Sequence, residues 1–124
     1  MRPPSLAETA IVERLSGPAT PEEIAALRRS VGQHLNELRQ AARRDELLPV
    51  DLAAELARKL DALLVGLEAL PPDAQALVVG VARYFVSEED AIPDRSGVLG
   101  LDDDLAVFNA AVRRIGRPEL EIDE

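Results

Sequence analysis

The chain of 124 residues has no cysteine, no tryptophan and a single histidine, His34. Without cysteine it can form no disulfide, no thiolate metal site and no cysteine nucleophile. With one histidine, a serine–histidine–aspartate triad or a multi-histidine zinc site would depend on that residue alone. His34 flanks an apolar helical stripe, and no nucleophile or orienting acid stands beside it in the sequence, which favours a place at the edge of the core over a role as general base.

Aromatic residues are also scarce, at 2% of the chain, whereas 19 alanines and 19 leucines account for much of the hydrophobic 47%. This composition is typical of a globular chain and favours helices packed closely on helices. At this length the sequence predicts one domain, residues 1–124, that folds without a disulfide or metal.

The chain has few basic residues. It contains 14 lysine and arginine residues and 23 aspartate and glutamate residues, so its net charge is −9. Residues 1–48 are balanced, whereas residues 87–124 have four basic and eleven acidic side chains. This field repels phosphate backbones, so we expect no direct binding of nucleic acid. The acidic last third leaves mimicry of nucleic acid as the lowest-ranked function.

Long hydrophobic runs are absent as well. No apolar run follows the first residues that could serve as a signal peptide, so a cytoplasmic location is expected. The most apolar segment, residues 74–86, is shorter than the roughly 20 residues that a membrane-spanning helix needs, which favours a central core helix over membrane insertion.

Helix-start and helix-stop residues divide the chain into five segments, and no strand-like alternation is visible. Ser5 with Glu8, and Thr20 with Glu23, form capping-box patterns, and Asp51 is expected to cap the third helix. The fold class is therefore all-α, a compact bundle of about five helices with a long loop between the fourth and fifth. The expected helices cover residues 5–15, 21–44, 51–70, 72–86 and 102–116, and the acidic tail, residues 119–124, is expected to fray.

Apolar spacing predicts which faces are buried. The second and third helices each have one apolar stripe and should pack antiparallel across the turn near Pro49. The fourth is apolar nearly all round, so we expect it to be the most buried. In the fifth helix the seam consists of Leu101, Leu105, Phe108, Val112 and Ile115.

An ordered set of residues between the fourth and fifth helices resembles the core motif of the YkvA-like family, the bacterial domain of unknown function 1232. The matching positions within residues 84–115 are Tyr84, Ser87, Asp90, Ile92, Pro93, Asp94, Val98, Leu99, Gly100, Asp103, Asp104 and Leu105. The chain departs from the pattern at Glu88, where proline is usual, and at residues 95–97, where apolar residues are usual. The resemblance implies a small helical domain and no established activity.

The residues of this motif allow a structural reading. Ile92 and Pro93 favour extended backbone, Asp94 can fix a turn, and Gly97 and Gly100 tolerate positive φ. Residues 102–104 would place carboxylates at the N-terminus of the fifth helix. Tyr84, Ser87, Ile92, Pro93, Asp94, Gly100, Asp103 and Asp104 are thus the structural motif.

The alternative is that Asp90, Asp94, Asp103 and Asp104 converge as oxygen ligands of Mg²⁺ or Ca²⁺, although their spacing matches no EF-hand loop. The leading hypothesis is a non-enzymatic interaction or scaffold module without a cofactor, which binds a protein partner or self-associates, for example as a homodimer. A divalent-cation protein with hydrolytic activity is the second hypothesis. No catalytic set of residues is apparent.

Overall fold

The computed structural model describes residues 3–44, 49–87 and 97–123, and these residues form helices and no strand. The all-α prediction is confirmed. The elements are α1 (Leu6–Leu15), α2 (Pro21–Ala42), α3 (Val50–Val65), the 3-10 turn η1 (Leu67–Ala69), α4 (Pro72–Val86), α5 (Gly97–Arg114) and the 3-10 turn η2 (Pro118–Leu120). Every helix of the described residues is too short or too polar to cross a lipid bilayer.

Both predicted capping boxes are present. The Ser5 Oγ accepts a hydrogen bond of 3.1 Å from the Glu8 N–H, and the Glu8 carboxylate accepts one of 2.8 Å from the Ser5 N–H. Thr20 and Glu23 repeat this exchange at the start of α2 with the same two distances. These bonds satisfy backbone donors that have no partner inside the helix, and they fix where α1 and α2 begin.

The ends of α3 differ from the prediction. Asp51 does not cap the helix, because Pro49 occupies the cap position and no side chain bonds there. The helix also ends at Val65 instead of continuing to Leu70, since Gly66 is a poor helix former and a 3-10 turn follows it. Leu70 is nevertheless buried, because the tighter turn still directs it into the core.

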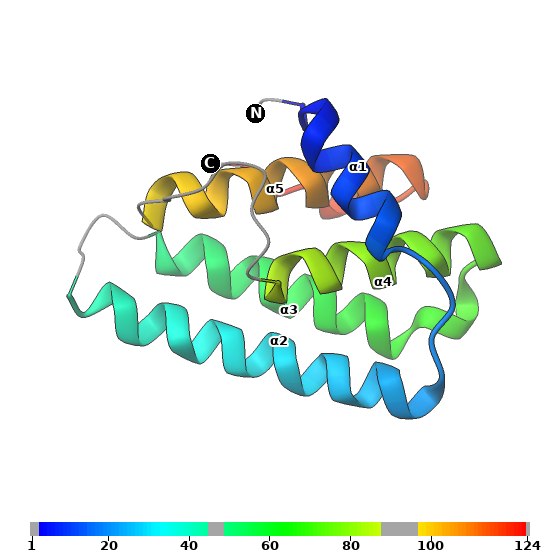
Figure 1. The fold of residues 1–124 in the computed structure, drawn as a ribbon, viewed down its shortest axis with the longest axis horizontal. Helices are drawn as coiled ribbons and strands as arrows, with labels where there is room; N and C mark the ends of the chain where they lie inside the picture. Colours follow the sequence, from blue (N-terminus) through cyan, green and yellow to red (C-terminus); the bar gives the residue numbers. More distant parts are fainter. Residues whose placement is uncertain (1–2, 45–48, 88–96, 124) are drawn as a thin grey trace.

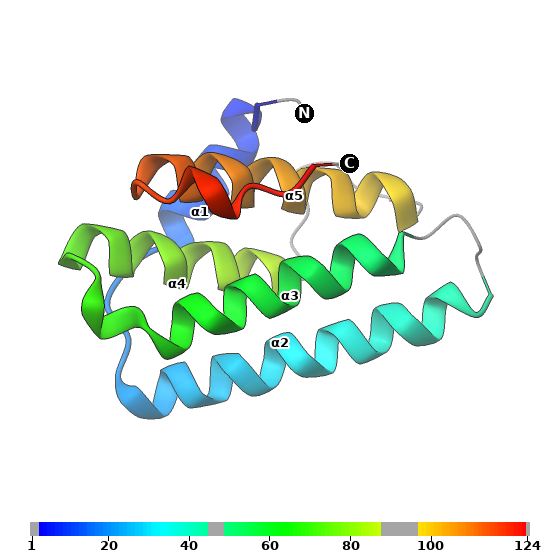
Figure 2. The same ribbon diagram turned by 180° about the vertical axis from the view of Figure 1, so that it is seen from behind.

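The helices form a bundle around α4, as predicted. In Figures 1 and 2, α2 and α3 lie side by side and antiparallel, with α5 on the other side of α3 and α4. Helix α4 contacts each of the other four α-helices, and eight of its 15 residues are buried. The helix of residues 72–86 is thus the centre of the core.

Helix α1 crosses α4 at a point of close backbone approach. A Cβ atom at Gly80 would lie 3.0 Å from the Cα of Ser16, so only glycine leaves room for the end of α1. Beside it, the Arg83 Nη1 donates a hydrogen bond of 2.9 Å to the carbonyl of Leu15. This bond satisfies one of the free carbonyl groups at the end of α1.

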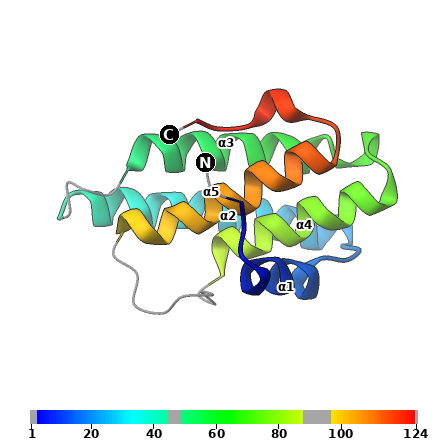
Figure 3. The same ribbon diagram turned by 90° about the horizontal axis from the view of Figure 1, so that it is seen from above.

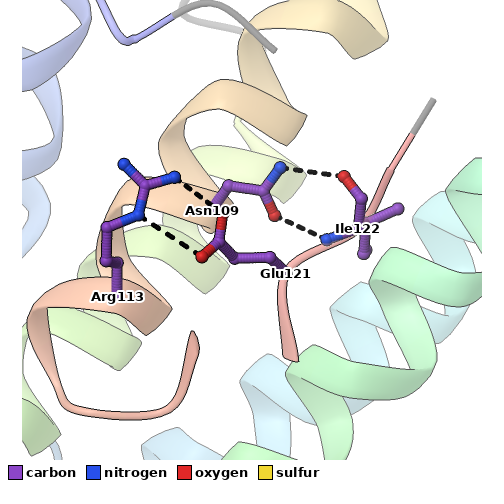
Figure 4. A network of polar contacts seen from close by, with 4 residues as sticks. All are labelled: Asn109, Arg113, Glu121 and Ile122. Atoms are coloured by element: carbon purple, nitrogen blue, oxygen red, sulfur yellow. Dashed lines mark hydrogen bonds and ion pairs between the residues drawn. The ribbon is translucent and has the colours of Figure 1, made fainter. Parts of the chain in front are cut away.

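The described part of the C-terminal segment, residues 119–123, is held against the bundle, contrary to the expectation that the acidic tail of residues 119–124 frays. Figure 3 shows it running back along α3, on the side of the bundle away from α1. The Asn109 side chain donates to the Ile122 carbonyl at 2.9 Å and accepts from the Ile122 N–H at 2.8 Å (Figure 4). Ile122 is 1% exposed. Acidity predicted a solvated tail, but one apolar anchor with both of its backbone groups satisfied outweighs the surrounding charge.

Candidate functional site

The motif aspartates do not stand at the start of the fifth helix. Helix α5 begins at Gly97, five residues before Asp102, so residues 102–104 lie inside it and cannot cap its first turn. Gly97 and Gly100 are helical and form no turn. A glycine costs about 1 kcal/mol in a helix, which the burial of the following apolar seam can offset. The N-terminal capping hypothesis for Asp103 and Asp104 is therefore wrong.

Asp103 has a different role, because it contacts Tyr84 inside the protein. The Tyr84 hydroxyl donates a hydrogen bond of 2.7 Å to the Oδ2 of Asp103. Tyr84 is 2% exposed and Asp103 is 3% exposed. Tyr84 lies near the end of α4 and Asp103 in the second turn of α5, so this bond joins the two helices on either side of the motif.

The surroundings of Tyr84 keep its hydroxyl protonated. Burial is the largest cause that raises the pKa of this group above its ordinary value, followed by the hydrogen bond to Asp103 and by the negative charge of that residue. The charges of Asp104 and Glu8 act in the same direction. Glu8 is fully buried at the start of α1. Three carboxylates from α1 and α5 thus act on one hydroxyl group of α4.

The structure describes some of the remaining motif positions and not others. Ser87 ends α4, where its N–H bonds to the Tyr84 carbonyl at 3.2 Å. Asp90, Ile92, Pro93 and Asp94 lie outside the described residues. Within the residues that are described, no three histidine, aspartate or glutamate side chains are grouped so as to hold a metal ion.

His34 lies at the edge of the core, as its position in the stripe of α2 predicted. Its side chain is partly exposed, and its ring meets the ring of Phe85 edge-on with the centroids 4.7 Å apart. The Glu37 carboxylate is 3.8 Å from its Nδ1.

Sequence reasoning missed the pairing of Tyr84 with Asp103, although a signal was present. Asp103 shares a helical face with Ala106 and Val107, three and four residues later, and both are buried. This face is separate from the seam of Leu101 and Phe108, so α5 is buried on two sides. A single carboxylate on a second apolar face requires a buried donor, and a tyrosine of the central helix can supply one.

Two of the grooves on the surface of the described residues are equal in volume. One has a volume of about 640 Å³ and lies between α2 and α3, with Gly32 and Ala54 among the residues that line it. The other, also of about 640 Å³, lies where α1, α4 and α5 meet, beside Glu13, Leu77 and Arg114. Both are open to solvent, in contrast to the buried contact of Tyr84 with Asp103.

These features define a small all-α protein in which a buried tyrosine–aspartate contact joins the central helix to the last one. Residues 74–110 match the family model described as "Protein of unknown function (DUF1232)". The match confirms the resemblance to the YkvA-like family over most of α4 and most of α5, and it begins ten residues before the motif. No curated protein and no solved structure matches the chain.

Proposed function

We propose that this protein is a non-enzymatic helical module that acts through contacts with other protein surfaces. The observation that supports the proposal is that Tyr84 and Asp103, two polar groups of the family motif, are directed at each other inside the core. A catalytic acid or base must come within hydrogen-bond reach of its substrate, and groups that are 2–3% exposed do not meet that condition in this conformation.

The electrostatics of the pair also favour a structural role. Because the pKa of Tyr84 is raised, its hydroxyl remains a hydrogen-bond donor throughout the physiological range and is a poor nucleophile or base. A donor held 2.7 Å from a buried carboxylate fixes the register of α4 against α5. Such a core holds the outer helices in place, and their grooves supply the surface at which a partner would bind.

Site-specific cross-linking in cells tests this proposal. A photoreactive amino acid is placed at Glu55 in the α2–α3 groove, at Glu13 in the α1–α4–α5 groove, or at exposed Glu119 as the control. We expect discrete cross-linked protein products from at least one groove and none from the control. If neither groove yields a product more often than Glu119 does, the protein does not act through these surfaces.

One observation favours a second candidate, a divalent-cation protein with hydrolytic activity. Asp103, Asp104 and Glu8 all raise the pKa of the Tyr84 hydroxyl, although the described carboxylates are not grouped so as to hold a metal ion. A divalent cation prefers oxygen ligands such as carboxylates. This candidate ranks second because one of these carboxylates already accepts a hydrogen bond from Tyr84.

A further inference from the structure

Each helix forms one edge of the groove between α2 and α3, and uncharged residues lie among the charged ones on both. The uncharged lining residues are Val31, Gly32 and Leu35 of α2 and Ala54 and Ala57 of α3. Gly32 and Ala54 have little or no side chain, and Val31 and Ala57 are buried, so another helical surface can approach closely at these positions. Val65, one helical turn beyond the groove on α3, is 62% exposed and extends the apolar surface.

The two edges of the groove differ in the sign of their charge. The edge formed by α2 has two charged residues, Arg28 and Arg39, and both are basic. The edge formed by α3 is mostly acidic, with Asp51, Glu55 and Asp61 against a single basic residue. Three basic and three acidic residues therefore line the groove of a chain whose net charge is −9. A balanced face is where two copies of an acidic protein can approach with least repulsion.

Oppositely charged residues of α2 and α3 lie at the same positions along the length of the groove. At one end, the Arg28 guanidinium bonds to the Asp61 carboxylate, with an Nε–Oδ1 distance of 2.8 Å. From that contact, Arg39 lies about 16 Å along α2 and Asp51 lies about 15 Å back along α3, at 1.5 Å per residue. Because the two helices are antiparallel (Figure 2), Arg39 and Asp51 share a level at the other end.

Two copies of the chain can place these grooves face to face about a two-fold axis in two ways, and opposite charges meet in only one of them. With the axis parallel to the groove, α2 of one copy covers α3 of the other, and Arg39 of each copy faces Asp51 of the other copy. With the axis across the groove, α2 covers α2, so that Arg28 faces Arg39 and acidic residues face each other. Like charges in contact oppose association, so the first pairing is favoured.

We propose that the α2–α3 groove is a self-docking surface that binds the same groove of a second copy of this chain, with the two-fold axis parallel to the helices. The inference rests on the proposed function and names its partner. In this pairing Gly32 of one copy and Arg58 of the other copy lie at the same position along the helices. The absence of a side chain at Gly32 leaves room for that arginine. The contact involves one face of a helix pair, so we expect weak and reversible association.

Sedimentation of the purified full chain tests the proposal, from micromolar to about millimolar concentration at about 0.15 M salt, where long-range repulsion is screened. We expect a concentration-dependent equilibrium of monomer and dimer. Gly32→Trp should abolish the dimer and leave the fold intact, because no atom lies within 4 Å of the Cβ position at Gly32. Gln33→Trp is the matched control, since Gln33 is exposed but does not line the groove. A monomer at every concentration, or a Gly32→Trp variant that dimerises as the wild type does, would overturn the proposal.

Charge exchange tests the direction of the pairing. Arg39→Asp and Asp51→Arg should each weaken the dimer by about fivefold or more, because each change alters two symmetric contacts. The double variant should recover the wild-type affinity. If Arg39→Asp strengthens the dimer, the axis crosses the groove and the proposed pairing is wrong.

Failure of this inference is distinguishable from failure of the proposed function. A chain that is monomeric in sedimentation, but that forms cross-links in cells to a different protein from either groove, refutes self-docking and leaves the interaction module intact. A chain that is monomeric and forms no cross-link from either groove refutes both.

Discussion

Replacement of Tyr84 by phenylalanine removes one hydroxyl group and keeps the ring, so it isolates the contact with Asp103. The wild-type hydroxyl donates a hydrogen bond of 2.7 Å to a carboxylate that is 3% exposed. A bond to a charged group contributes about 1.5–3 kcal/mol, and the variant leaves a buried carboxylate oxygen without that donor. We therefore expect Tyr84→Phe to lower the free energy of unfolding by about 2–3 kcal/mol at neutral pH. For a domain of this size that corresponds to a fall in Tm of about 8–12 °C.

The same contact makes stability depend on alkaline pH. The pKa of Tyr84 is raised in the folded protein, whereas in the unfolded chain the hydroxyl should lose its proton near its ordinary value of about 10. The folded state then binds more protons than the unfolded state. The stabilisation is complete below a pH of about 10, and as the pH rises above that value it is lost at about 1.4 kcal/mol per pH unit.

Tyr84 is well suited to this measurement because the chain has one tyrosine and no tryptophan. The near-ultraviolet absorbance of tyrosinate therefore reports on Tyr84 alone, and circular dichroism of the same samples reports on the helices. We expect tyrosinate to appear only together with loss of helix. Tyr84→Phe retains every other titratable group of the chain, so the difference between the two proteins is due to Tyr84.

The reasoning would be refuted by tyrosinate that forms at a pH near 10 while the helices persist, or by a Tyr84→Phe variant as stable as the wild type. A double-mutant cycle with Asp103→Asn measures the coupling directly, since each single variant alters one partner. A coupling energy near zero would mean that the two groups do not act on each other.

Three further outcomes are expected. Gly80→Ala should lower the free energy of unfolding by about 1–3 kcal/mol, because the added methyl group collides with the end of α1. Gly32→Ala, at a position with open space around it, should raise the free energy of unfolding by about 0.5–1 kcal/mol. Thermal unfolding that shifts the Tm of both variants in the same direction would contradict this expectation. Asn109→Ala should release the C-terminal segment and speed hydrogen exchange of the Ile122 N–H, and unchanged exchange would show that the tail is held by other contacts. Millimolar Mg²⁺, Ca²⁺ or Mn²⁺ at matched ionic strength should shift Tm little; a saturable rise abolished by Asp103→Asn would instead support the cation-binding candidate.

Local features of this fold could be predicted from the sequence because they depend on residues close together in the chain. Ser5 and Glu8 are three positions apart, and the capping box that they form needs no other element. The fourth helix could be identified as central because it is apolar nearly all round, and such a helix requires neighbours on every side.

The features that could not be predicted depend on contacts between distant elements. The sequence predicts too late a start for α5 because glycine is typical of turns, although packing of the helix seam overrides that preference. The late start makes Asp103 a candidate cap, whereas its partner Tyr84 is 19 residues away in the sequence. Ile122 is a single apolar residue among acids, and only the fold brings Asn109 to its backbone.

The family match and the proposed docking surface occupy different parts of the molecule. The match covers residues 74–110, which include Tyr84 and Asp103 and hold α4 against α5. The charges of the proposed docking surface, such as Arg39 and Asp51, lie on α2 and α3, outside the matched residues. A chain that shares the matched segment can therefore keep the same core and differ in every charge of the groove. Binding of a second copy is for that reason an expectation for this chain, argued from its own residues, and it does not follow from the family match.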